Sequence, residues 1–206
     1  MDEQQRYENF IKGLLKFINK LDNKAALFIH LHRKLYNNFD DVQLAPVLFV
    51  PIMESLYVDL VISLAKLYEQ GSTRNLNKFL NFVESNQHKI RWNGEGISQQ
   101  KLSEHKQLLE SEKSAISHVL AQRNKYFAHH DCKYFTDSEK INDDYPVTID
   151  DFRRLIEVAW KIINEHSFAL NKFKMISQSP WYVISLEQIF EKLQELNKTN
   201  TKEFIG

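Results

Sequence analysis

Three residues in one short stretch combine a permanent positive charge with groups that titrate near neutral pH. Arg123 precedes His129 by six residues and His130 by seven, within the segment SHVLAQRNKYFAHHD at residues 117–131. The planar fork of an arginine matches two phosphate oxygens and can stabilise negative charge that develops on a phosphate. A histidine can take a proton from a hydroxyl group or protonate a leaving oxygen. Together these residue types suit cleavage of RNA without a metal ion.

The apolar residues of this stretch predict that it lies on a helix rather than in a loop. Val119, Leu120, Tyr126 and Phe127 recur at helical spacing, and we expect the helix to span about residues 99–128. At about 100° per residue, His129 lies roughly 120° around the helix from Arg123, whereas His130 lies nearly in line with it. Helical projection therefore favours His130 as the partner of Arg123.

Acid–base cleavage needs two proton-transferring groups, and two copies of the stretch can supply them. An isologous interface brings the same patch of both chains together, so we expect a dimer formed near the motif helix. Other interpretations assign no chemistry: Arg123 can complement the helix dipole, and Asn124 can be an ordinary polar residue near a helix end. Asp131 can accept a hydrogen bond from a neighbouring histidine. Histidine, aspartate and cysteine also bind metals, but with a single cysteine and no second cluster we expect neither a metal nor a cofactor.

The stretch resembles a known family. Arg123 and His129 fit the R-x(4–6)-H motif of HEPN domains, and RNKYFAHHD is similar to the RNKxxAHxD form of abortive-infection AbiU-type HEPN proteins. Residues 32–80 are also similar to that family, through HRKLYNNF, an Ala-Pro pair, LAKLYE and NLNKFL. VTIDDFRRLI resembles the family after the motif. Two positions depart from its pattern: Lys66 stands where arginine is frequent, and Glu69 stands where aspartate is frequent. The second departure leaves the role of Glu69 open.

The resemblance implies a fold and an activity. The expected fold is an all-α, HEPN-like up-and-down helical bundle with additional flanking helices. The implied activity is that of a metal-independent endoribonuclease, in which attack by the RNA 2′-hydroxyl leaves a 2′,3′-cyclic phosphate, within a phage-defence (abortive infection) or toxin component. The alternative is a non-catalytic HEPN dimer that acts as a scaffold and binds RNA, a nucleotide or a protein partner. Expected partners are RNA, a second copy of the chain and a cognate antitoxin.

The resemblance also assigns roles to individual residues. In the family the histidine follows the alanine that is Ala128 here, so His129 is taken as catalytic and His130 as its rival. The complete catalytic set is Arg123, Asn124 and His129. The residues expected to bind substrate are Lys125, Asp131 and Lys133.

Composition and charge restrict the class of protein. The chain has 206 residues, 43% of them hydrophobic, and only 5 Gly and 4 Pro, which favours one domain, residues 1–206, built from long helices. Lys plus Arg and Asp plus Glu both number 27, so attraction to RNA must come from local charge. A single cysteine and the absence of a signal-peptide pattern indicate a cytoplasmic protein. Charged residues and prolines in the apolar stretch 42–68 favour a core helix over a membrane span.

The same reasoning predicts the elements around the motif. We expect helices over about residues 4–21, 23–37, 46–69, 76–84, 149–174 and 186–197, the last as an appendage. Residues 132–147 are expected to form a polar connection that acts as a flap near the site. Glu54 or Asp59 could pair with Arg123, although a solvated position is the simpler interpretation. Trp92 could stack on a base or anchor its loop.

Overall fold

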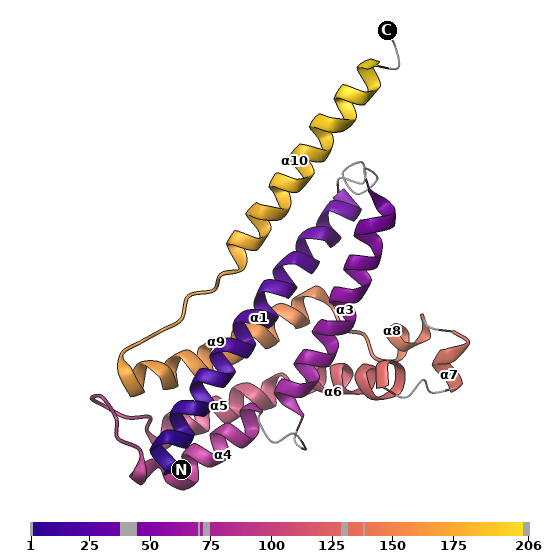
Figure 1. The fold of residues 1–206 in the computed structure, drawn as a ribbon. Helices are drawn as coiled ribbons and strands as arrows, with labels where there is room; N and C mark the ends of the chain where they lie inside the picture. Colours follow the sequence, from indigo (N-terminus) through magenta and orange to yellow (C-terminus); the bar gives the residue numbers. More distant parts are fainter. Residues whose placement is uncertain are drawn as a thin grey trace. The chain divides into compact units, whose positions relative to one another are not determined.

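The chain folds as helices joined by short connections. The computed structural model describes residues 2–37, 45–69, 71, 75–128, 132–137 and 139–203, without the side chains of residues 46, 128, 135 and 199–203. Within these ranges every regular element is helical, which confirms the predicted all-α class. The α-helices are α1 (Glu3–Asn37), α3 (Pro46–Tyr68), α4 (Leu76–Asn86), α5 (Gln99–Ser111), α6 (Lys113–Gln122), α7 (Cys132–Phe135), α8 (Lys140–Asp144), α9 (Ile149–Asn171) and α10 (Ser179–Glu203) (Figure 1). A 3₁₀ turn, η1, spans Gln87–Lys89, and a π-helix, η2, spans Arg123–Ala128.

The chain divides into two compact units. The motif unit comprises residues 1–21 and 60–176, and the terminal unit comprises residues 22–59 and 177–206. Helices α1 and α3 each contribute one part to each unit. The prediction of two N-terminal helices was wrong, because residues 3–37 form one uninterrupted helix.

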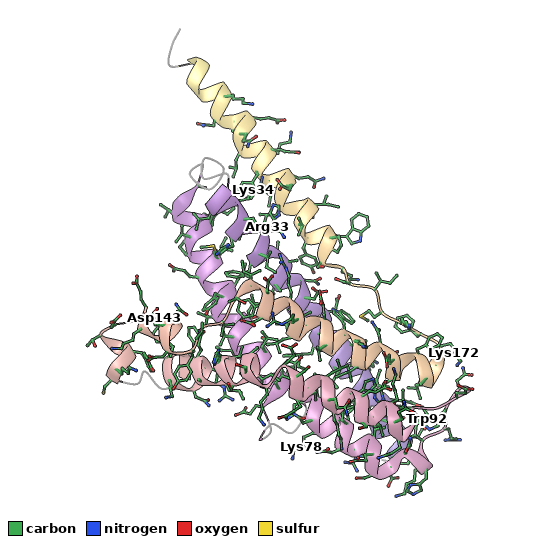
Figure 2. All side chains as sticks on the ribbon, turned by 180° about the vertical axis from the view of Figure 1, so that it is seen from behind. Arg33, Lys34, Lys78, Trp92, Asp143 and Lys172 are labelled. Atoms are coloured by element: carbon green, nitrogen blue, oxygen red, sulfur yellow. The ribbon has the colours of Figure 1, made fainter. Side chains whose placement is uncertain are left out.

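In the motif unit, α9 packs against α5 and α6, and α4 packs against α5. The apolar residues of α9 recur every three or four positions, so one stripe faces the core; it includes Phe152, Leu155, Ile156, Ala159, Ile162 and Ile163, all buried. Thr148 and Asp151 form a capping box at the start of this helix. Lys172, which Figure 2 labels, follows the end of the helix. Its φ is 60°. Trp92 packs edge-on against Tyr7, so it anchors its loop.

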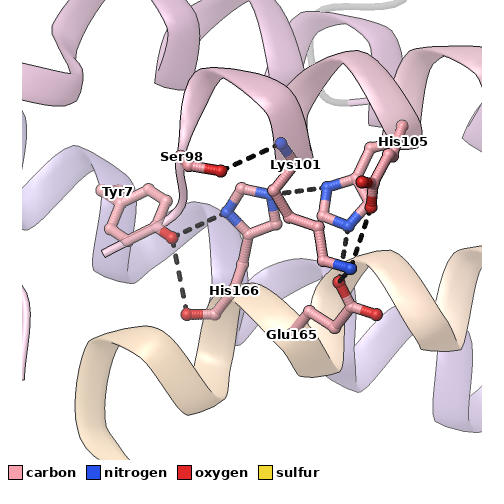
Figure 3. A network of polar contacts seen from close by, with 7 residues as sticks. Tyr7, Ser98, Lys101, His105, Glu165 and His166 are labelled. Atoms are coloured by element: carbon pink, nitrogen blue, oxygen red, sulfur yellow. Dashed lines mark hydrogen bonds and ion pairs between the residues drawn. The ribbon is translucent and has the colours of Figure 1, made fainter. Parts of the chain in front are cut away.

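A polar network crosses the core of the motif unit between α1, α5 and α9 (Figure 3). Tyr7 Oη lies 2.8 Å from His166 Nδ1, and His166 Nε2 lies 3.3 Å from His105 Nδ1. His105 Nε2 in turn lies 2.8 Å from a carboxylate oxygen of Glu165. One set of tautomers satisfies all three contacts: the Tyr7 hydroxyl donates to His166, His166 donates to His105, and His105 donates to Glu165. Tyr7 and both histidines are fully buried.

The terminal unit has a small core of its own. Leu31 of α1, Phe49 of α3, and Leu186 and Phe190 of α10 are buried together. Helix α10 is longer than the predicted 186–197. Proline is tolerated in a first helical turn, so Pro180 lies at the start of α10 instead of ending the preceding segment. Ser185 lies inside this helix and donates to the carbonyl of Trp181.

The two halves of helix α3 differ in how far their apolar side chains are buried. Leu60, Val61 and Leu64 are buried in the motif unit, as a core helix requires. In the terminal unit, Val47 and Leu48 are exposed. By length and composition Val47–Tyr68 could cross a membrane, with a mean hydropathy of 1.9 and 22% of its most apolar window buried. The expectation of a core helix therefore holds for its second half, whereas its first half buries Phe49 and leaves Val47 and Leu48 exposed.

Candidate active site at the end of α6

The helix that carries the motif is not one regular α-helix. It is interrupted at Glu112, which separates α5 from α6, and at Arg123 it passes into the π-helix η2. A π-helix forms hydrogen bonds from i to i+5, so each residue turns through a smaller angle than in an α-helix, and such segments are frequent at functional sites. The projection that favoured His130 assumed α-helical winding. Residues 123–128 wind as a π-helix, so the projection does not apply to them.

Arg123 is held by a carboxylate from another helix. Its Nη2 atom forms an ion pair with Oε2 of Glu69, the residue that follows α3. Their side chains are 22% and 34% exposed, respectively, so the pair is partly shielded from water but open on one side. A guanidinium carries five N–H donors in a rigid fork, and one carboxylate oxygen leaves most of them available. The arrangement can fix the orientation of Arg123 and still present N–H groups to a phosphate.

The buried amide of Gln122 anchors the residue before Arg123. Gln122 is 0% exposed. Its Nε2 atom donates to Asn142 Oδ1 at 3.1 Å and to the Tyr145 carbonyl at 2.8 Å. One turn earlier, His118 Nδ1 lies 2.8 Å from the Pro146 carbonyl. These contacts tie α6 to α8 and to the residues that follow it, and so fix the axial position and rotation of the motif.

The two predicted substrate-binding lysines both contact this same segment. Lys125 Nζ donates to the Tyr145 hydroxyl at 2.7 Å and lies 4.8 Å from the centre of its ring. Lys133 forms an ion pair with Asp144, and Tyr134 donates to Asp144 at 2.8 Å. The hydrogen bond from Lys133 lowers the pKa of Asp144 below its usual value. Residues 132–147, expected as a polar flap, thus contain α7 and α8 and are tied to the motif by side chains.

The other predicted residues are placed only in part. Asn124 is exposed on η2, beside Arg123 in the chain. His129, His130 and Asp131 lie outside the described residues, so the choice between the two histidines stays a prediction. Cys132 is exposed and free. In the described part of the chain no three His, Cys, Asp or Glu residues gather as a metal site.

Sequence reasoning did not give Glu69, Gln122 or Tyr145 a place in the site. Glu54 and Asp59 were considered as partners of Arg123, but Asp59 pairs with Lys24 at 2.6 Å and Glu54 is exposed. The signal for Glu69 was present, because it occupies a position where the resembled family has an acidic residue. Gln122 and Tyr145 carried no such signal, since a helical pattern does not reveal which polar side chain is buried.

Comparison with known proteins identifies one family. The family model of AbiU2, a HEPN type, matches residues 10–181, which covers Glu69, Arg123 and the segment through Tyr145. No curated protein and no solved structure matches the chain.

Proposed function

The chain belongs to the AbiU2 family of HEPN proteins, and from that premise we propose that it is a metal-independent endoribonuclease acting in abortive infection or as a toxin. The observation that best supports this function is the ion pair between Arg123 and Glu69, which is partly exposed and lies where α6 ends. A permanently charged fork, oriented by a carboxylate and partly exposed, suits the binding of a scissile phosphate.

The reaction assigns each group one role. The 2′-hydroxyl of the RNA attacks the adjacent phosphorus, the bond from phosphorus to the 5′ oxygen breaks, and the products are a 2′,3′-cyclic phosphate and a 5′-hydroxyl end. A neutral histidine removes the 2′ proton, and a protonated histidine donates a proton to the leaving oxygen. Arg123, with Asn124 beside it, stabilises the charge on the phosphate oxygens. We assign the histidine role to His129, with His130 as its rival.

A single chain offers one motif, so the acid and the base come from two copies. We propose a homodimer in which the two motif segments face each other, because a two-fold axis brings identical patches together. Light scattering at micromolar protein should give about twice the chain mass of 24.4 kDa. A strict monomer that still cuts RNA would contradict the two-chain site.

The test of activity is cleavage of structured and unstructured RNAs in excess chelator. Arg123→Ala and His129→Ala should each abolish cleavage and leave the unfolding transition unchanged; Arg123 lies where α6 ends, with a partly exposed side chain outside the core. His130→Ala distinguishes the two histidines: a mild effect supports His129, and a complete loss assigns the role to His130. The rate should peak between weakly acidic and neutral pH, because one histidine must be neutral while the other is protonated.

The alternative function is a non-catalytic HEPN scaffold that binds RNA, a nucleotide or a protein such as a cognate antitoxin. Glu69 neutralises the charge of Arg123 in the free protein, and the chain as a whole carries no net charge. Both observations weaken attraction to RNA. If the purified dimer cuts no RNA, or if replacing Arg123 and both histidines changes nothing, the scaffold function replaces the nuclease. An antitoxin gene beside this one would support a toxin pair.

A further inference from the structure

A groove runs along α6 towards the Arg123–Glu69 pair. It has a volume of about 420 Å³ and lies among the end of α3, α4, α5 and α6. Its apolar surface includes Leu80, Leu109 and Leu120, and Tyr68 also lines it. The volume lies within the range of sites that hold small organic ligands, about 300–1,000 Å³. The groove is therefore large enough for a nucleobase with its ribose.

The groove reaches the proposed cleavage site through two chain connections. Leu120 precedes Arg123 by three residues on the same helix, which is a rise of about 4.5 Å. Tyr68 immediately precedes Glu69, the partner of Arg123. A ligand in the groove would thus contact residues within one helical turn of Arg123 in the chain and the residue next to its partner Glu69.

The rim of the groove carries the polar groups that a nucleotide needs. Asn77 and Asn81 both line it from α4, and their i,i+4 spacing places the two amides on one face of that helix. Asn77 Nδ2 donates to the Tyr68 carbonyl at 3.4 Å, whereas Asn81 is exposed. The Asn81 amide offers a donor and an acceptor side by side, which is the pattern that asparagine uses on base edges. Ser117 adds a hydroxyl from α6.

Two lysines at the rim of the groove can bind phosphates of the RNA backbone. Lys106 pairs with Glu84 at 2.7 Å and Lys113 with Glu110 at 2.6 Å, both on the surface. Exposed ion pairs of this kind contribute little free energy, so the lysines can exchange these partners for phosphate oxygens. The groove combines an apolar floor with two amides and adjacent lysines. This combination fits a nucleobase and its phosphate better than it fits an apolar side chain of a peptide.

We propose that this groove is the binding subsite for an unstacked nucleobase of single-stranded RNA, next to the bond that Arg123 positions. The assignment rests on the proposed nuclease function for its cleavage consequence, but the binding of a base does not require cleavage. It makes single-stranded or looped RNA the substrate class, because a base in a duplex is stacked and cannot enter.

Ser117→Trp and Ser114→Trp form a matched pair for the test. Both serines are exposed on α6 within one turn of each other, but only Ser117 lines the groove. The probes are labelled 2′-fluoro homopolymers of A, C and U of about ten nucleotides, which lack the attacking hydroxyl and cannot be cut. Binding is followed by fluorescence anisotropy, and cleavage of the corresponding 2′-hydroxyl RNAs is measured in chelator.

We expect Ser117→Trp to weaken probe binding about ten-fold, the loss that removal of one base contact produces, while Ser114→Trp binds like the unaltered protein. Asn81→Ala should reduce the difference in affinity among the three homopolymers, and Asn86→Ala, on the same helix but outside the groove, should not. Equal binding by the two tryptophan variants overturns the subsite, as does failure of the unaltered protein to bind any probe. Discriminating binding without cleavage of any RNA would overturn the nuclease and leave the subsite in place.

Discussion

Replacing Tyr7 by phenylalanine tests the polar network in the core of the motif unit. The substitution removes one hydroxyl and keeps the ring, which stacks on Phe79 at a centroid distance of 5.8 Å and packs against Trp92. In the assigned tautomers the hydroxyl donates to Nδ1 of His166, so Tyr7→Phe leaves that nitrogen as a buried acceptor without a donor. No large cavity forms, because only one oxygen atom is lost.

The size of the effect follows from burial. His166 is fully buried, so water cannot replace the lost hydrogen bond. A buried polar group left without its partner costs about 1–3 kcal/mol of stability. We therefore expect Tyr7→Phe to lower the free energy of unfolding by about 1–3 kcal/mol, most of it from the orphaned nitrogen.

The same network makes the stability depend on pH. Burial lowers the pKa of His166 well below the ordinary 6.5 and also lowers that of His105, although Glu165 opposes the shift at His105. Below pH 6.5 these two histidines bind protons in the unfolded chain but stay neutral in the folded protein. Stability is thus fully present above that pH and is lost as the pH falls, by up to about 1.4 kcal/mol per pH unit for each histidine. Burial raises the pKa of Glu165, but hydrogen bonds from His105 and Lys101 lower it overall. Protonation of Glu165 therefore removes further stability at more acidic pH.

Urea unfolding at about pH 8 and about pH 5.5 measures both effects. Tyr182→Phe is the matched control, because that tyrosine is 44% exposed and should be neutral. Two results would refute the reasoning: a Tyr7→Phe protein as stable as the unaltered one, or a stability that does not decline between these two pH values.

Three further perturbations address the site and the terminal unit. Glu69→Gln should tighten binding of non-cleavable RNA about two- to five-fold in anisotropy, because the carboxylate no longer competes with phosphate for Arg123; Glu157→Gln, on the exposed surface of α9, should leave it unchanged. Gln122→Leu should speed amide hydrogen exchange in residues 140–145, since it removes two of the hydrogen bonds that hold this segment; unaltered exchange would mean that the remaining contacts are enough to hold α8. Phe190→Ala should destabilise the terminal unit by about 3–5 kcal/mol in calorimetry without lowering RNA affinity, and an equal loss of affinity would contradict the assignment of the site to the motif unit.

The sequence alone predicted the all-α class, the position of most long helices and the identity of the motif. Periodic apolar residues act locally, so they predicted where most of the long helices lie. The caps Thr148 and Asn75, at the starts of α9 and α4, are local in the same way. The type and order of Arg123, Asn124 and the following histidines are likewise local, and they were enough to suggest the family that the comparison then identified.

Only the tertiary structure decided which residues surround that motif. Glu69 lies more than fifty positions before Arg123, and Tyr145 lies on a segment that was expected to be an irregular connection. The winding of η2 also departs from the regular α-helix that periodicity assumes. Contacts between distant segments depend on how helices pack and rotate against each other, and a one-dimensional pattern records the buried face of each helix but not its partner. The groove beside Arg123 arises in the same way, from the meeting of four helices.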